Sequence, residues 1–94
     1  MGEFEWDALK AQGNLAKHGV SFEAARLVFD DVFALERLDV GGERAEVRYV
    51  TTGMANGVVL TVVYIERGER IRIISARKAT RHEQEEYYRS QTAE

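Results

Sequence analysis

The chain has 94 residues, with 13 lysines and arginines, 16 aspartates and glutamates and a formal net charge of −3. This length predicts one domain, residues 1–94, with a modest hydrophobic core. The lack of cysteine excludes disulfides, thiol catalysis and cysteine-based zinc sites. The first residues, MGEFEWD, are acidic where a signal peptide is basic, and the apolar run 58–65 is too short to cross a bilayer. We therefore expect a soluble, cytoplasmic protein.

The N-terminal segment predicts a short strand followed by a helix. Residues 4–6 read as the strand, and Asp7 after them is a good helix N-cap. The helix is expected to run from Ala8 to about His18, where Gly19 supplies the left-handed position that ends it. Gly13 weakens the middle of this helix, and a glycine at such a position is usually tolerated where another element packs closely.

A second helix is predicted from Phe22 to about Phe29. Ser21 is its expected N-cap, and Asp30 and Asp31 end it. Its apolar stripe consists of Phe22, Ala25, Val28 and Phe29.

The period then changes to that of strands. Four strands are predicted, at residues 32–40, 44–53, 58–66 and 69–77. The segment 58–66 is apolar on both faces, so it should be the central strand of an antiparallel meander, with an Asn56-Gly57 turn before it and an Arg67-Gly68 turn after it.

The last predicted element is a helix from residue 81 to about 90. Thr80 and Glu83 form a capping box at its start. The expected order is therefore β-α-α-β-β-β-β-α. Two N-terminal helices and one C-terminal helix packed against an antiparallel meander define an α+β fold.

Positive charge gathers in residues 66–82, which hold six lysines and arginines and two glutamates. The rest of the chain is acidic, so this segment permits a local phosphate-binding surface. The plainer interpretation, which charge alone favours, is that the arginines solvate one face of the sheet.

Candidate site residues gather on the first helix and the last strand. Lys10, Asn14, Lys17 and His18 share one helix face, a stripe that can grip a phosphate and move a proton. A lysine and a histidine near a helix C-terminus also stabilise the helix, and that interpretation is the stronger for His18 alone. His82, at the start of the last helix, is the weaker histidine candidate.

Strand alternation makes a prediction for Arg77. Continued without a bulge, it puts Arg77 on the side of Ile71 and Ile73, either paired with Glu66 or a helix carboxylate or held at a pocket rim.

Tyr87 and Tyr88 either stack on bases or cover the sheet, and helical spacing places at least one in the core.

Two blocks of the chain, KAQGNLAKHGVSFEAARLVF and YIERGERIRIISARKATRHEQEEYY, resemble the BrnT toxin family of bacterial type II toxin–antitoxin systems. The matching residues are Lys10, Asn14, Lys17, His18, Gly19, Phe22, Glu66, Arg67, Gly68, Arg72 to Arg77, Thr80, Glu83 and Tyr87. The blocks stand in the family's order at about its spacing. In the middle, GGERAEVR departs from the family, because Arg44 is followed by Ala45 and not by an aromatic residue.

The resemblance implies a RelE-like fold and a ribonuclease that inhibits translation. It also implies a BrnA-type antitoxin, through which the complex contacts operator DNA. RNA would then be the substrate, with no metal, no cofactor and no membrane partner.

Metal-free RNA cleavage by the neighbouring 2′-hydroxyl needs proton transfer and charge stabilisation, which histidine and arginine supply. We assign proton transfer to His18, phosphate binding to Lys17 and Arg77, and supporting charge to Arg44 and Lys10. Further RNA contacts are assigned to Arg67, Arg70, Arg72 and Tyr87. Two alternatives stay open: the same cations bind RNA or an acidic partner without catalysis, or His18 ends a helix while Arg77 closes an ion pair that holds the last helix.

Overall fold

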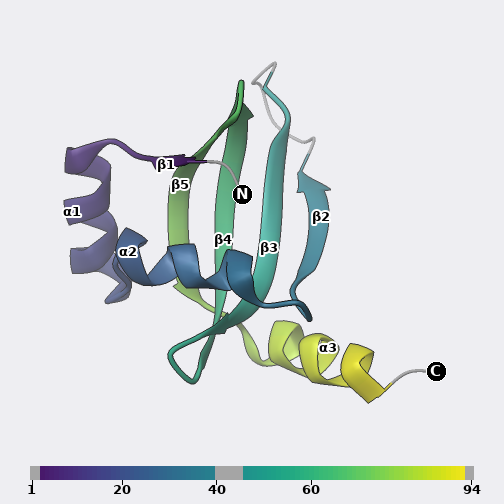
Figure 1. Cartoon of the computed structure of the whole chain (residues 1–94). Helices are drawn as coiled ribbons and strands as arrows, with labels where there is room; N and C mark the ends of the chain where they lie inside the picture. The colour runs from purple at the N-terminus through teal and green to yellow at the C-terminus, as the bar shows by residue number, and fades with distance from the viewer. Residues whose placement is uncertain (1–2, 40–45, 93–94) are drawn as a thin grey trace.

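A computed structural model describes residues 3–39 and 46–92 as three α-helices, one 3₁₀-helix and a five-stranded sheet (Figure 1). The elements are β1 (Glu3–Glu5), α1 (Ala8–His18), α2 (Phe22–Ala25), η1 (Arg26–Asp30), β2 (Leu35–Asp39), β3 (Arg48–Ala55), β4 (Val58–Arg67), β5 (Arg70–Lys78) and α3 (Arg81–Thr92). The strand order is β1-β5-β4-β3-β2, and only the β1–β5 pair is parallel. The predicted α+β class and element order are confirmed.

Helix α1 has the bounds that its capping residues predict. The Asp7 side chain accepts a hydrogen bond from the Lys10 backbone N–H at 2.9 Å. At the other end, Gly19 adopts a left-handed φ of 71°, and its N–H bonds to the Leu15 carbonyl at 2.8 Å. No element packs closely on Gly13, since a Cβ there would meet nothing within 4 Å.

The second predicted helix is divided in two. Ser21 caps α2 as expected, with its hydroxyl accepting from the Ala24 N–H at 3.0 Å. After Ala25 the chain tightens into the 3₁₀-helix η1, which places Val28 against β3 at Gly53. A Cβ at Gly53 would lie only 2.9 Å from Val28 Cγ1, so this contact requires glycine.

Strands β3, β4 and β5 form the predicted meander, with β4 in the centre. Asn56 and Gly57 both have positive φ, 52° and 81°, as a two-residue hairpin turn of type I′ requires. Strand β2 begins at Leu35 and β3 at Arg48, each later in the chain than predicted.

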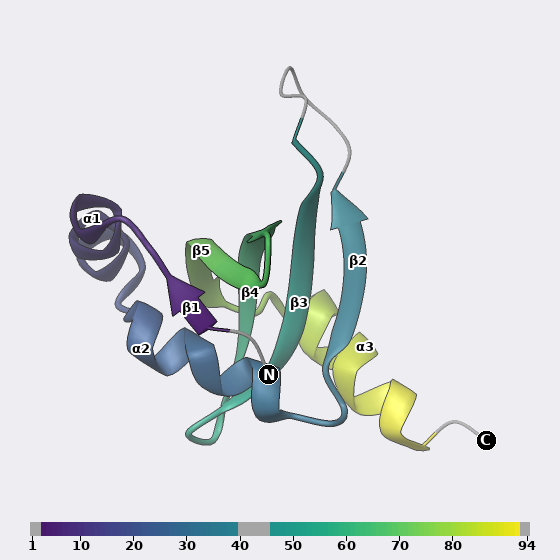
Figure 2. The same cartoon turned by 45° about the horizontal axis from the view of Figure 1, so that its top comes forward.

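The two faces of the sheet carry different helices (Figures 1 and 2). One face holds the main core, in which α1, α2 and η1 cover Leu60, Val62 and Ile73. The other face carries α3, whose only buried residue, Tyr87, packs with Val59 and Ala79.

An irregularity in β5 changes which way its last residues point. Ile73 pairs with Tyr64, but Ser75 pairs with Val63, so Ile74 is an extra residue in the ladder. Such a bulge reverses the alternation beyond it. Arg77 therefore lies on the face opposite Ile73, and the prediction that it shares the isoleucine side is wrong.

Candidate functional site

The predicted stripe on α1 divides into a buried amide and exposed charges. Lys10 and Lys17 are exposed, and His18 is half-buried at the last helical position. Asn14, in contrast, is only 8% exposed. Among residues 3–39 and 46–92, no hydrogen bond or ion pair holds the side chains of Lys17 and His18, so the helix end presents a lysine and an imidazole side by side.

Asn14 attaches α1 to the edge of the sheet. Its Nδ2 donates to the carbonyls of Val20 at 2.9 Å and Ala76 at 2.7 Å, and its Oδ1 accepts from the Ala76 N–H at 3.1 Å. The carboxamide thus pairs with the β5 backbone where β1, which reaches only to Arg72, no longer covers it. Asn14 is occupied by these bonds and is not part of an open phosphate site.

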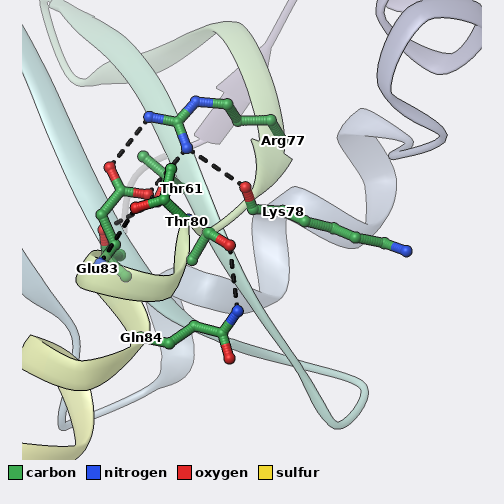
Figure 3. A network of polar contacts seen from close by, with 8 residues as sticks. Thr61, Arg77, Lys78, Thr80, Glu83 and Gln84 are labelled. Carbon is green, nitrogen blue, oxygen red and sulfur yellow. Dashed lines mark hydrogen bonds and ion pairs between the residues drawn. The ribbon is translucent and has the colours of Figure 1, made fainter.

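Arg77 lies in a polar network on the α3 face of the sheet (Figure 3). Its Nη1 and Nη2 donate to the two carboxylate oxygens of Glu83 at 2.8 and 3.0 Å, and Nη1 also reaches the Lys78 carbonyl at 3.3 Å. The Thr61 hydroxyl donates to Glu83 at 2.9 Å. Of the alternatives left open for Arg77, the structure shows the pairing with a helix carboxylate, in an ion pair that joins β5 to α3.

Glu83 also closes the predicted capping box of α3. Its carboxylate accepts from the Thr80 N–H at 2.8 Å, while its own N–H donates to the Thr80 hydroxyl at 3.1 Å. The hydrogen bonds from Arg77, Thr80 and Thr61 outweigh burial and lower the pKa of Glu83 to about 2. The same contact with Glu83 raises the pKa of Arg77. Both groups are therefore charged at neutral pH.

The predicted strand arginines Arg70 and Arg72 link β5 to β1. Arg70 Nε lies 3.5 Å from Glu3 Oε1, and Arg70 Nη1 lies 3.3 Å from Glu5 Oε1. Arg72 Nη1 lies 3.2 Å from the other carboxylate oxygen of Glu5, Oε2. Burial would raise the pKa of Glu5, but hydrogen bonds from the two arginines lower it. Arg67 is exposed at the end of β4, opposite Arg70 in the ladder.

Two arginines that sequence reasoning missed join this face. Residues paired across a ladder share a face and alternate along each strand. In the ladders, Arg37 pairs with Val50, and Val50 pairs with Val63. Thr61 lies two residues before Val63 on the same face of β4, and it pairs with Arg77. Arg37 and Arg77 therefore share a face. Arg48 lies two residues before Val50 and shares that face. The alternation of residues in EVRYV indicates that Arg48 and Val50 share one face of a strand. Which face of the sheet that is depends on the register of the strands.

We call this surface the arginine face and define it by its members: Arg37, Arg48, Arg67, Arg70, Arg72 and Arg77. His18 is not on it, because α1 packs at the β5 edge and the helices α1 and α2 cover the opposite face. Within the described ranges, no hydrogen bond or ion pair joins His18 or Lys17 to Arg77.

Tyr87 does not offer a surface for RNA. It is 2% exposed, and its hydroxyl donates to the Asp31 carboxylate. Burial and this hydrogen bond raise the pKa of Tyr87 to about 12. The expectation that it contacts RNA is therefore wrong, while the expectation that one of the two tyrosines is in the core is confirmed; Tyr88 is 49% exposed.

Arg44 lies outside the described residues. His82 is exposed on α3, 3.6 Å from Glu86. Within residues 3–39 and 46–92, no three His, Cys, Asp or Glu side chains are grouped so as to hold a metal ion, and no helix is long and apolar enough to cross a membrane.

The chain matches the model of a known protein family. The family described as the ribonuclease toxin, BrnT, of type II toxin-antitoxin system matches residues 6–83. This range covers most of the chain, from Trp6 through the arginine face to Glu83. A comparison with curated proteins finds no match to this chain.

Proposed function

We propose that this chain, which belongs to the BrnT family, the ribonuclease toxins of type II toxin–antitoxin systems, cuts RNA without a metal ion. It does so in the cytoplasm and thereby inhibits translation. The observation that carries this function is the family match over residues 6–83, which includes both the helix end at His18 and the strand end at Arg77.

The reaction uses the RNA's own 2′-hydroxyl as nucleophile. The 2′-oxygen attacks the adjacent phosphorus, the bond to the 5′-oxygen breaks, and a 2′,3′-cyclic phosphate forms. One proton leaves the 2′-oxygen and another reaches the departing 5′-oxygen. His18 carries one of these transfers, since imidazole gives and takes protons near neutral pH. Lys17, next to it on the exposed helix end, holds the phosphate.

Arg77 stabilises the charge that develops on the phosphate oxygens, as a guanidinium does where it is held in place. Glu83 holds it through Nη1 and Nη2, and the Arg77 side chain remains 38% exposed. Lys10 and Arg44 add supporting charge. Because Arg77 and α1 lie on different sides of β5, RNA must pass over the β5 edge to contact both.

The chain's protein partner is a BrnA-type antitoxin that neutralises it. A type II system pairs a protein toxin with a protein antitoxin, so the family match supports such a partner. Operator DNA is contacted only through the antitoxin.

The test is the rate at which purified variants cut an end-labelled RNA in EDTA. We expect His18→Ala and Arg77→Ala each to lower the rate by about 100-fold or more, in line with the loss of one acid–base or oxyanion-stabilising group. His82→Ala is the matched control, because it removes the chain's other imidazole, which is exposed on α3 and lies 3.6 Å from Glu86. A His18→Ala rate within a few-fold of the control would contradict the proton-transfer role.

A second candidate function is RNA binding without cleavage. The separation of His18 from Arg77 favours it, since the structure shows no contact between the two groups within the described residues. Salt-dependent RNA binding without any product, also in the presence of translating ribosomes, would support this candidate over the ribonuclease.

A further inference from the structure

We infer that the arginine face binds the sugar–phosphate backbone of RNA and is indifferent to base sequence. The inference rests on the proposed function, because it takes RNA as the ligand. It goes further in assigning Arg37 and Arg48 to RNA binding and in naming what the site recognises, which is phosphate.

Arginine is concentrated on one side of the sheet. Every arginine of β2, β3, β4 and β5 projects from the face that carries α3, and none projects from the face that packs on α1 and α2. Three interstrand spacings of about 4.8 Å separate β2 from β5, so the charges extend roughly 14 Å across the sheet. Guanidinium groups spread over four adjacent strands suit a polyanion that crosses the strands.

The side chains that lie between these arginines determine what else the face can contact. On β3, β4 and β5 they are aliphatic or hydroxyl groups: Val50, Thr52, Thr61, Val63, Ile65 and Ser75. Thr52 and Thr61 bond to each other at 3.0 Å, and Thr61 also bonds to Glu83, so these hydroxyls are engaged. The face offers neither a carboxamide nor an aromatic ring from these strands.

Aromatic rings gather on the other side of the sheet. Tyr49 and Tyr64 stack with ring centroids 5.3 Å apart, and Tyr64 also contacts Phe29 of η1. Single-stranded RNA is usually read by bases stacking on aromatic rings of a sheet, with hydrogen bonds to their edges. Without such a ring on the strands of the arginine face, phosphate contacts supply the binding energy, and these carry no sequence information.

Carboxylates on this surface neutralise part of its positive charge. Glu3, Glu5 and Glu83 each contact an arginine of the face, and they hold Arg70, Arg72 and Arg77 in place. Arg37, from the opposite edge, lines a groove of about 190 Å³ between β2 and α3 together with Thr52, Glu83 and Glu86. Partial neutralisation predicts modest affinity, and binding through phosphate contacts predicts that this affinity falls as the salt concentration rises.

The test measures binding of wild-type protein to fluorescent 2′-O-methyl oligomers of U, A, C and a mixed sequence, by anisotropy. These oligomers lack the nucleophile and stay intact. We expect dissociation constants that agree within about threefold among sequences. The logarithm of the dissociation constant should rise with the logarithm of the salt concentration, with a slope of about 0.7 for each phosphate neutralised. Arg37→Ala and Arg72→Ala should weaken binding of all oligomers equally and each lower the slope by about 0.7.

Arg26→Ala is the matched control. It removes the same charge, but Arg26 lies over the Phe4 ring on the opposite face, so binding should hardly change. Melting temperatures show that each variant is folded.

The inference is overturned by a preference of about tenfold between sequences at one salt concentration, by an Arg37→Ala effect no larger than that of Arg26→Ala, or by no binding at low salt. Cleavage of unmodified RNA is measured separately. Cleavage that does not respond to Arg37→Ala would remove only this inference, and binding without cleavage would remove only the proposed ribonuclease.

Discussion

The Asn14 carboxamide takes the place of a neighbouring strand at the edge of β5. Its partners, the Ala76 backbone and the Val20 carbonyl, are buried and lose their bonds in an Asn14→Ala variant. A buried polar group left unsatisfied costs about 1–3 kcal/mol, so we expect a loss of about 3 kcal/mol in the free energy of unfolding, measured in urea. Gln12→Ala, exposed on the same helix, is the control and should cost less than about 0.5 kcal/mol. Equal losses would show that the amide does not hold α1.

Two glycines predict opposite responses to an added methyl group. Gly13 lies inside α1 with nothing within 4 Å of a Cβ, so Gly13→Ala should stabilise the protein by about 0.5–1 kcal/mol. Gly53→Ala would place its Cβ 2.9 Å from Val28 Cγ1 and 3.1 Å from Ala34 Cβ, so it should destabilise. Thermal unfolding of both variants checks the signs, and a destabilised Gly13→Ala would mean that α1 is not a regular helix at this position.

At the scale of the element, the attachment of α3 depends on a charged pair and one buried ring. Because the pKa of Glu83 is lowered to about 2 from its ordinary 4.5, the contact with Arg77 stabilises the fold above about pH 4.5. That stabilisation is lost as the pH falls through about 2. We expect the melting temperature of the wild type to exceed that of Glu83→Gln at pH 7, and the difference in melting temperature to disappear near pH 2.

Glu85→Gln serves as the control for the acid titration. Glu85 contacts Arg81 at 3.4 Å, but both side chains are largely exposed, so the pair should contribute little at any pH. A Glu83→Gln difference that persists unchanged at acid pH would exclude a role of the carboxylate charge in holding α3.

Local signals predicted the helices better than the strand ends. Asp7, Gly19 and the Thr80–Glu83 capping box act within a few residues, and each was confirmed where the sequence placed it. The start of β2 and the parallel pairing of β1 depend on partners far away in the chain, so no local pattern reports them. The bulge at Ile74 is of the same kind, and it alone moved Arg77 to the other face.

At the scale of the whole molecule, the predicted site residues fall into two groups on different sides of β5. Lys10, Lys17 and His18 belong to α1, while the arginine face lies across the sheet with α3. Helical spacing correctly grouped the first set but could not show that Asn14, in the same stripe, is turned inward and bonded to β5. Arg37 and Arg48 belong to the second group because of the pairings β2–β3, β3–β4 and β4–β5. These pairings are known only once the fold is known.

The end chemistry of RNA cut by the purified protein in EDTA tests the central claim most directly. Attack by the 2′-hydroxyl without a metal ion predicts fragments that end in a 2′,3′-cyclic phosphate and begin with a 5′-hydroxyl. Fragments with free 3′-hydroxyl ends, or cutting that requires added magnesium, would contradict the mechanism proposed for His18 and the arginines.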